Sequence, residues 1–304
     1  MSRLLLLATV AAAALVVALP ASQAASVGVS VSSPDDVTFV AGSGETNVLN
    51  VDNFSPGLIV TDSGAVLAAG AGCVSLGPNS SECELRPNIN ADLGNKDDSA
   101  RVLWNGLVQI WAGSGDDTVV ASAFGQHAVA YGEAGDDNLG VVGEGGQLAD
   151  GGPGDDIVNV FAFGGESTGI GGNGRDTIEF RHSVSTGIGP ATLDGGNGDD
   201  TISAQPTHSG VSTATGGRGD DIIVITSVPP FYGAGSSYEL SGDQGDDALT
   251  GGASIDVVDG GRGDDSIDVR GGGADTVTCG AGNDVVLYDA SDSVSADCET
   301  ASLS

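Results

Sequence analysis

Residues 242–287 read GDQGDDALT, GGASIDVVD, GGRGDDSID, a single Val269, RGGGADTVT and CGAGNDVVL. Each group has nine residues of the form G-G-x-G-x-D-x-U-x, in which U is aliphatic. One copy of so short a pattern is weak evidence in a chain with 51 glycines. Five copies in a row agree in residue type, spacing and aliphatic position, and they predict a repeating structural unit.

Each unit divides into a six-residue turn and a three-residue strand. Glycine adopts positive φ angles and permits close backbone approach, as a tight turn requires. Backbone carbonyls of the turn can point the same way, and the aspartate at position six adds a carboxylate. Ca²⁺ takes about six to eight oxygen ligands, so these turns are predicted to bind calcium ions. The alternative is that they are only Gly/Asp turns between strands.

Position eight of each unit is expected to point into the core, because strand side chains alternate between faces. All five residues at this position are aliphatic: Leu249, Val258, Ile267, Val277 and Val286.

The tandem block resembles the RTX (repeats-in-toxin) repeats. The resemblance implies an all-β fold, namely a right-handed parallel β-roll or β-solenoid with Ca²⁺-binding GGxGxD turns. GAGCVSL (70–76), ECEL (82–85) and the tail DASDSVSADCET (289–300) also resemble the two ends of small secreted RTX-like calcium-binding proteins of actinobacteria. In that family the molecular activity is calcium binding, whereas the biological roles vary.

Single units with longer spacing precede the tandem block. They are LGNKDDSA (93–100), AGSGDDTVV (112–120), GEAGDDNLG (132–140), GGPGDDIVN (151–159), GGNGRDTIE (171–179), GGNGDDTIS (195–203) and GGRGDDIIV (216–224). Their position-six aspartates follow one another at 19 to 26 residues, close to the 18 residues of two nonapeptides. Two nonapeptides make one turn of a β-roll, so each of these coils is predicted to keep one calcium turn while its opposite turn has diverged.

The phase of the tandem block gives an independent check. If the diverged coils keep its geometry, the residue two positions before each motif should face the core. These residues are small or apolar: Ile110, Ala130, Ala149, Gly169, Leu193, Ala214 and Leu240.

The predicted calcium ligands are position-six carboxylates and loop carbonyls. The carboxylates are those of Asp117, Asp137, Asp156, Asp176, Asp200, Asp221, Asp247, Asp265, Asp275 and Asp284. The carbonyls are those of Gly113, Gly115, Gly135, Gly152, Gly154, Gly172, Gly174, Gly196, Gly198, Gly217, Gly219, Gly245, Gly261, Gly263 and Gly282. Asp98 and Asp256 are not counted among these ligands, because Lys96 and Ser254 occupy glycine positions in their loops. Glu133 also occupies a glycine position, in the loop of Asp137.

These residues predict two ladders. Ten loops, from Asp98 to Asp284, should stack along one edge and hold at most nine ions between successive coils. Asp256 and Asp275 should begin a second ladder on the other edge, with room for one ion.

The composition is strongly acidic, with 33 Asp and 9 Glu against one Lys and eight Arg, a net charge of −33. General solubility or adaptation to salt would recruit Glu as well, so the Asp excess indicates ligation in turns. Without a basic patch to neutralise phosphates, nucleic acid is excluded as a partner.

Stacked coils lie about 4.8 Å apart, so carboxylates of neighbouring loops face each other. Such a pair costs about 1 kcal/mol in bulk water and about 3 kcal/mol near a protein surface. Summed over the ladder, this repulsion exceeds a usual stability of about 5–15 kcal/mol. Calcium binding is therefore expected to be coupled to folding.

Residues 1–24 have the features of a secretory signal peptide, and the protein is expected to be secreted. Arg3 precedes an apolar run from Leu4 to Leu19, and small residues flank a cleavage point after Ala24. An uncleaved anchor is the alternative, although the run is short for a span of about 20 residues. The mature chain is expected to have no transmembrane domain.

The remaining chain divides into three parts. Residues 25–90 alternate strand-like stretches with Gly, Ser, Asn and Pro, and are predicted to form a β-rich N-terminal cap without a calcium unit. Residues 91–287 form the calcium-binding β-roll, and residues 288–304 a C-terminal cap or tail.

Four cysteines in a secreted chain favour two disulfides, with three pairings available. We favour the local pairs Cys73–Cys83 and Cys279–Cys298, which bracket a short polar loop and the C-terminal tail. Thiolate ligation of a metal is the alternative.

The zinc-protease motif of enzymes that often accompany such repeats is missing, because the sequence has no HExxH. The favoured function is therefore a non-enzymatic, structural or adhesive role at the cell surface, with a cell-surface glycan or protein as partner.

The loop 226–238, with Pro229, Pro230, Phe231, Tyr232 and Tyr238, is a recognition candidate or simply covers the core edge. The alternative function is a lyase- or epimerase-like glycan enzyme on the diverged face, with candidates Tyr131, Asp150, Glu166, Glu179, Arg181, His182 and Asp194.

Overall fold

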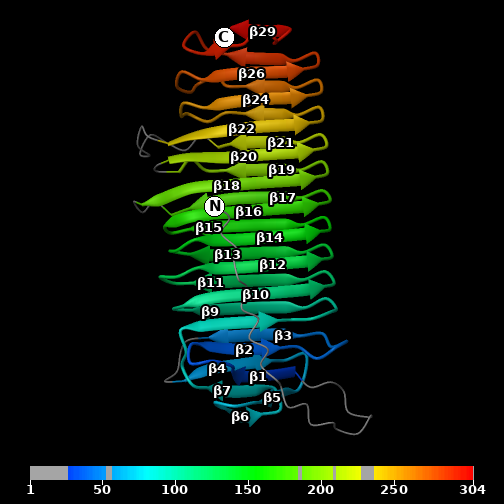
Figure 1. The fold of residues 1–304 in the computed structure, drawn as a ribbon, viewed down its shortest axis with the longest axis vertical. Helices are drawn as coiled ribbons and strands as arrows, with labels where there is room; N and C mark the ends of the chain where they lie inside the picture. The colour runs from blue at the N-terminus through cyan, green and yellow to red at the C-terminus, as the bar shows by residue number, and fades with distance from the viewer. Residues whose placement is uncertain (1–26, 53–56, 184–186, 208–209, 227–235, 304) are drawn as a thin grey trace, which may run out of the picture.

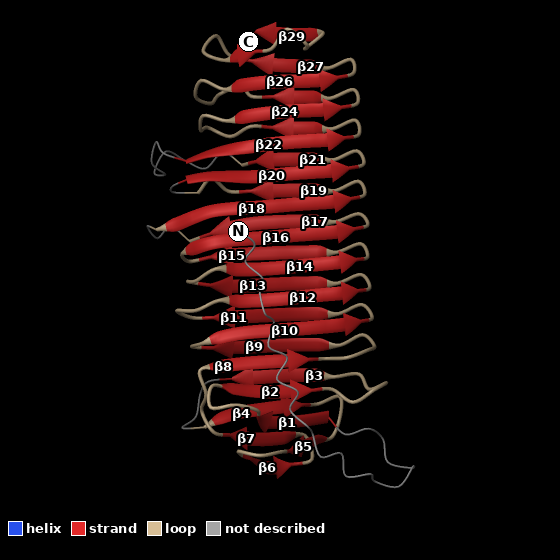
Figure 2. Cartoon of the chain, in the orientation of Figure 1, coloured by secondary structure: helices blue, strands red, loops and turns tan. Residues whose placement is uncertain are grey.

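A computed structural model describes residues 27–52, 57–183, 187–207, 210–226 and 236–303. Within these residues all regular elements are β-strands, arranged in two sheets along the length of the molecule (Figures 1 and 2). From β8 onward, successive strands alternate between the two sheets, so each coil contributes one strand to each. This confirms the predicted all-β parallel solenoid. The predicted signal peptide, residues 1–24, lies outside the described residues.

Sheet A has fourteen strands. They are β1 (Val27–Val31), β2 (Asp36–Val40), β5 (Leu67–Ala69), β8 (Asn88–Asp92), β10 (Leu107–Ser114), β12 (Ala128–Ala134), β14 (Gln147–Pro153), β16 (Gly165–Asn173), β18 (Ile188–Asn197), β20 (Gly210–Arg218), β22 (Ser236–Gln244), β24 (Val257–Arg262), β26 (Thr276–Ala281) and β28 (Ser293–Val294).

Sheet B has fifteen strands. They are β3 (Val48–Asp52), β4 (Leu58–Asp62), β6 (Cys73–Gly77), β7 (Ser80–Cys83), β9 (Ser99–Trp104), β11 (Thr118–Ala123), β13 (Asn138–Gly143), β15 (Ile157–Ala162), β17 (Thr177–His182), β19 (Thr201–Ala204), β21 (Ile222–Ile225), β23 (Ala248–Thr250), β25 (Ser266–Asp268), β27 (Val285–Tyr288) and β29 (Thr300–Leu303).

The N-terminal strands differ from the rest in their pairing. β1 pairs antiparallel with β2, β3 with β4, and β7 with both β4 and β6. β2 and β3, however, already pair in parallel with β8 and β9. The coil geometry therefore begins inside the segment predicted as a cap, and the boundary at residue 90 stays a prediction.

The core is a stack of apolar side chains between the sheets. The position-eight residues Leu249, Ile267 and Val286 are neighbours in sheet B and are buried. The residues two before each motif form one row of sheet A, each paired with the next: Ile110, Ala130, Ala149, Gly169, Leu193, Ala214, Leu240, Val258 and Val277. All are buried, so the phase predicted from the tandem block is confirmed.

The two edges of the solenoid differ. Short, uniform loops lead from each sheet A strand to the following sheet B strand along one edge, which we call the ladder edge; on the right of Figure 1 they lie one above another. Loops of unequal length lead back to sheet A along the opposite edge, which we call the diverged edge. Residues 227–235 of the predicted recognition loop lie outside the described residues. Tyr238 is fully buried, and its hydroxyl donates to the Gln205 carbonyl (2.9 Å).

Three ladder loops keep their backbone conformation without glycine. Lys96, Glu133 and Asp243 have φ values of 99°, 73° and 71°. All three stand where the repeat has glycine, and Asp243 was not singled out from the sequence. A left-handed non-glycine residue costs about 1–2 kcal/mol, so the surrounding coils impose this conformation on the loop.

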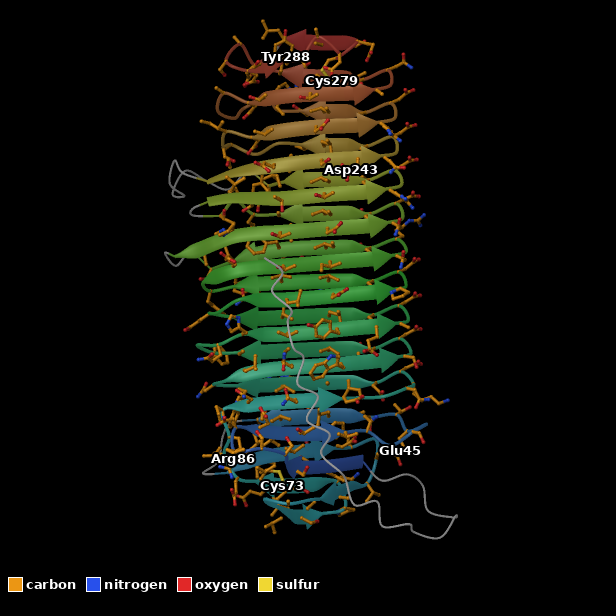
Figure 3. All side chains as sticks on the ribbon, viewed as in Figure 1. Glu45, Cys73, Arg86, Asp243, Cys279 and Tyr288 are labelled. Carbon is orange, nitrogen blue, oxygen red and sulfur yellow. A yellow bond between two sulfur atoms is a disulfide. The ribbon has the colours of Figure 1, made fainter. Side chains whose placement is uncertain are left out.

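Two disulfides lie near the two ends of the solenoid. Cys73 bonds Cys83 across the β6–β7 pair, and Cys279 of β26 bonds Cys298 near the C-terminus. Figure 3 shows Cys73 and Cys279 near opposite ends of the molecule. These are the local pairs that the sequence favoured, and all four thiols are used.

Gly154 and Gly140 make a matched pair for testing the ladder backbone. Gly154 has φ +149°, and an added Cβ would lie 1.9 Å from the Gly135 carbonyl oxygen. In β13, an added Cβ on Gly140 would meet its nearest neighbour at 3.6 Å. Gly154→Ala should therefore lower the unfolding free energy by more than about 2 kcal/mol, and Gly140→Ala should change it by less than about 1 kcal/mol. Urea unfolding in CaCl₂ measures both, and equal midpoints would contradict this account of the ladder.

Candidate calcium sites

The position-six aspartates of the ladder edge form one continuous stack. Ten carboxylates, from Asp98 to Asp284, are only 0–3% exposed. Each aspartate's backbone amide donates to Oδ1 of the aspartate in the following coil, at 2.6–2.9 Å. The sequence prediction of ten loops on one edge therefore agrees with the structure.

The second oxygen of each of these carboxylates has no hydrogen-bond partner. Oδ2 is buried and unpartnered at Asp98, Asp117, Asp137, Asp156, Asp176, Asp200, Asp221, Asp247, Asp265 and Asp284. A buried, unpaired carboxylate oxygen carries a large desolvation cost, so a row of them calls for a missing partner.

In six ladder loops, those of Asp137, Asp156, Asp176, Asp200, Asp247 and Asp265, a carbonyl of the next coil lies near the free oxygen. A Cβ placed on Gly132 would lie 2.3 Å from Asp137 Oδ2 and 2.4 Å from the Gly151 carbonyl oxygen. On Gly242 the corresponding distances are 2.2 Å to Asp247 Oδ2 and 2.4 Å to the Gly260 carbonyl. Two oxygens from successive coils thus converge on the space beside the first glycine of each loop, which suits a hard cation.

The predicted glycine carbonyls point along the stack. The Gly135 oxygen would touch a Cβ on Gly154 at 1.9 Å, and the Gly154 oxygen one on Gly174 at 2.0 Å. The carbonyls two residues earlier also point toward the next coil. The Gly152 oxygen, for example, would lie 2.0 Å from a Cβ on Gly172. No group of three or more His, Cys, Asp or Glu side chains suited to a metal occurs in the described part of the chain. Main-chain oxygens would therefore supply most of the ligands, and these residues fit calcium as their cation.

The aspartates at position five form a second, exposed row. The amide of Asp136 donates to Asp116 Oδ1 (3.0 Å), and that of Asp155 to Asp136 Oδ1 (2.9 Å). These bonds run toward the preceding coil, opposite to those at position six. Arg175 interrupts the row, and its guanidinium lies 3.5 Å from Asp199.

Sequence reasoning missed the two ends of the ladder. Asn47 occupies position six in the coil before Asp98. Its backbone amide donates to Asp98 Oδ1 (2.5 Å). At the other end, the backbone amide of Asp284 donates to Glu299 Oε2 (3.0 Å). The segment AGSGETN (41–47) could have revealed the first end, because it is a GGxGxD-like turn with one extra residue. The absence of a calcium unit from residues 25–90 stays a prediction, although this segment contains a repeat-like turn.

The carbonyls of the first residue in each loop were missed as well. Gly151, Gly171, Gly195, Gly216, Gly260 and Cys279 supply them. No sequence signal marks a carbonyl, since every residue has one.

The second ladder on the diverged edge is short. The Asp256 amide donates to Asp275 Oδ1 (2.8 Å), and that of Asp275 to Asp292 Oδ1 (3.1 Å). Asp256 is saturated within its own loop, by Ser254 Oγ and the Gly252 amide (both 2.9 Å). Asp275 Oδ2 is free, and a Cβ on Gly272 would meet it at 2.8 Å and the Gly252 carbonyl at 3.0 Å. The structure thus groups Asp275, but not Asp256, with the ladder aspartates.

Burial raises the pKa of the nine ladder carboxylates from Asp98 to Asp265. The pKa is about 6 for Asp117 and about 7 for Asp137, Asp176 and Asp221. Desolvation is the main cause, and neighbouring ladder carboxylates add to it. Without a cation, these carboxylates therefore keep their protons to a higher pH than free carboxylates do.

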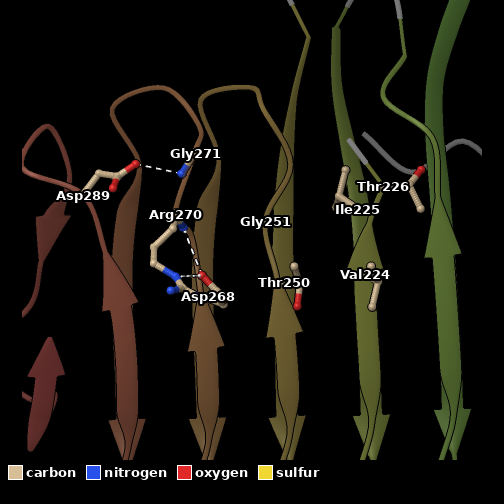
Figure 4. Close-up of a pocket in the computed structure, with 9 residues that line it drawn as sticks. All are labelled: Val224, Ile225, Thr226, Thr250, Gly251, Asp268, Arg270, Gly271 and Asp289. Carbon is tan, nitrogen blue, oxygen red and sulfur yellow. Dashed lines mark hydrogen bonds and ion pairs between the residues drawn. The ribbon is translucent and has the colours of Figure 1, made fainter. Parts of the chain in front are cut away.

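A cleft of about 660 Å³ opens on the diverged edge (Figure 4). Arg270 lines this cleft, and its guanidinium donates two hydrogen bonds to the Asp268 carboxylate (2.9 and 2.6 Å). The residues considered for a glycan enzyme do not gather there. Tyr131, Asp150, Glu166 and Asp194 lie in sheet A, whereas Glu179, Arg181 and the buried His182 lie in β17 of sheet B.

Asp156 and Asp155 are adjacent and allow a matched test of the ladder sites. Asp156→Asn should remove at least one bound ion and weaken calcium affinity at least tenfold, because it replaces a buried free oxygen by an amide. Asp155→Asn removes the same charge at an exposed position, and should leave the ion count unchanged. Calorimetric titration measures both, and equal losses would place the ligands elsewhere.

The raised pKa values also predict a pH dependence. A folded-state pKa above the unfolded value stabilises the protonated fold, and this contribution is lost as pH rises through about 4 to 7. The calcium-free chain should therefore have more β-structure at about pH 5 than at about pH 8, whereas calcium affinity should be higher at about pH 8. Circular dichroism and titration at both pH values test this; a calcium-free chain most ordered at the higher pH would contradict it.

Comparison with known proteins agrees with the geometry. The model of the RTX calcium-binding nonapeptide repeat matches four segments, residues 106–124, 185–205, 241–272 and 271–286. No curated protein and no solved structure matches the chain. The matched segments cover loops of the ladder edge in the early, middle and tandem parts of the repeat region. The chain therefore carries RTX calcium-binding nonapeptide repeats, and its described part has the form of a β-solenoid.

Proposed function

We propose that the protein is secreted, folds on binding calcium, and has a structural or adhesive role at or outside the cell surface. The observation that carries this proposal is the row of buried, unpartnered Oδ2 atoms along the ladder edge. A fold that buries these charges without a counter-ion is strongly disfavoured, and calcium reverses the sign of that contribution.

The two disulfides support secretion, because such bonds persist in oxidising compartments. The leader-like sequence of residues 1–24 supports it as well. Within the described residues, no helix has the length and apolarity to cross a membrane.

The proposed partner is a cell-surface glycan or protein that docks on the diverged edge. Loop length varies there without disturbing the coils, and the 660 Å³ cleft offers Thr226, Thr250 and Asp289 beside the Arg270–Asp268 pair. The ladder edge, in contrast, is occupied by its own stacked loops. A non-enzymatic role fits this arrangement, since the candidate residues for a glycan enzyme are split between the two sheets.

Circular dichroism in EDTA and in millimolar CaCl₂ tests the coupling of folding to calcium. The chain should be largely unfolded in EDTA and β-rich in CaCl₂, and equimolar MgCl₂ should not replace CaCl₂, because Mg²⁺ demands smaller, octahedral sites. Identical spectra in EDTA and CaCl₂ would remove the basis of the proposal.

A further inference from the structure

Three unpartnered side-chain oxygens lie in the N-terminal strands and the turn beside them, outside the matched repeat segments. They are Glu45 Oε2, Asn47 Oδ1 and Asp62 Oδ2. Asn47 and Asp62 are each 0% exposed. Buried polar atoms nearly always have a partner, so three in one region of the N-terminal strands require an explanation.

The other polar atoms of Asn47 and Asp62 are already committed. Asp62 Oδ1 accepts from the amides of Val48 and Gly64, both at 2.9 Å. Asn47 Nδ2 donates to the Leu93 carbonyl (3.0 Å) and to Asp98 Oδ1 (3.1 Å). These bonds fix both side chains, so their free oxygens cannot turn toward another donor.

The backbone brings the three residues together. The Val48–Asp62 bond sets the Asp62 carboxylate beside the Asn47–Val48 peptide, and Leu49 is the strand partner of Asp62. A Cβ on Gly64 would lie 2.1 Å from the Thr46 carbonyl and 3.1 Å from the Asn47 Cα. Glu45 lies on the ladder edge (Figure 3), and its pKa is raised by burial and then by the charge of Asp62.

No positive side chain neutralises this group. The salt bridges within the described residues all involve arginine, and none includes Glu45 or Asp62. The free atoms are two carboxylate oxygens and one amide oxygen, which are ligands that Ca²⁺ accepts and that balance its charge.

We propose that Glu45, Asn47 and Asp62 form a calcium site of their own, the cap site, which joins the antiparallel N-terminal strands to the first coil. It differs from the ladder sites because side chains, and not glycine carbonyls, supply the three ligands named here. Its expected effect is to hold the β3–β4 pair against the turn at residues 41–47.

Native mass spectrometry of the full chain, which counts bound calcium ions, tests the cap site. Asp62→Asn and Glu45→Gln should each bind one ion fewer than the unmodified protein. Asp35→Asn, the same charge change at an exposed residue of the N-terminal segment, should leave the count unchanged. Circular dichroism in CaCl₂ should show the same β content for all four proteins.

Unchanged counts in both Asp62→Asn and Glu45→Gln would overturn the cap site. If Asp62→Asn lost several ions together with its β content, the variant would have misfolded, and the count for the more exposed Glu45→Gln would decide. The result is separable from the ladder proposal. If the ladder bound no calcium, the unmodified chain would carry one ion, and both variants would lose it.

Discussion

The hydrogen bond from each position-six amide to the aspartate of the next coil is the interaction on which the structure depends. It holds Oδ1 in place and thereby leaves Oδ2 buried and free, facing the first carbonyl of the following loop. One bond thus aligns the coils, concentrates negative charge and prepares an oxygen-lined space. The same contact thus joins successive coils and orients the oxygen that is available to a cation.

Much of this could be predicted from the sequence, because the repeat fixes both the core and the loop. The row from Ile110 to Val277 follows from a constant phase, and the stack from Asp98 to Asp284 from a constant position in each loop. What could not be predicted lacks a repeating signal. Asn47 and Glu299 replace aspartate by other residues, and Asp243 keeps a glycine conformation that only its neighbours impose.

The two ends of the ladder show how a charged stack can stop. At Asn47, an amide group lies where the other coils have a free carboxylate oxygen, and it donates to the Leu93 carbonyl and to Asp98. The neutral amide thus ends the row of aspartates at this position. At the opposite end, Glu299 receives the last ladder amide, and the neighbouring Cys298–Cys279 disulfide ties that segment to β26.

The position-six bonds all point the same way along the molecule, from each coil to its successor. Without the following coil, a coil has an unpaired neutral amide. Without the preceding coil, it has a buried carboxylate oxygen that lacks its donor. The two termini of the solenoid are therefore unequal as growing points. The C-terminal end of a stack therefore offers a neutral donor to a further carboxylate, whereas the N-terminal end leaves a charged acceptor open.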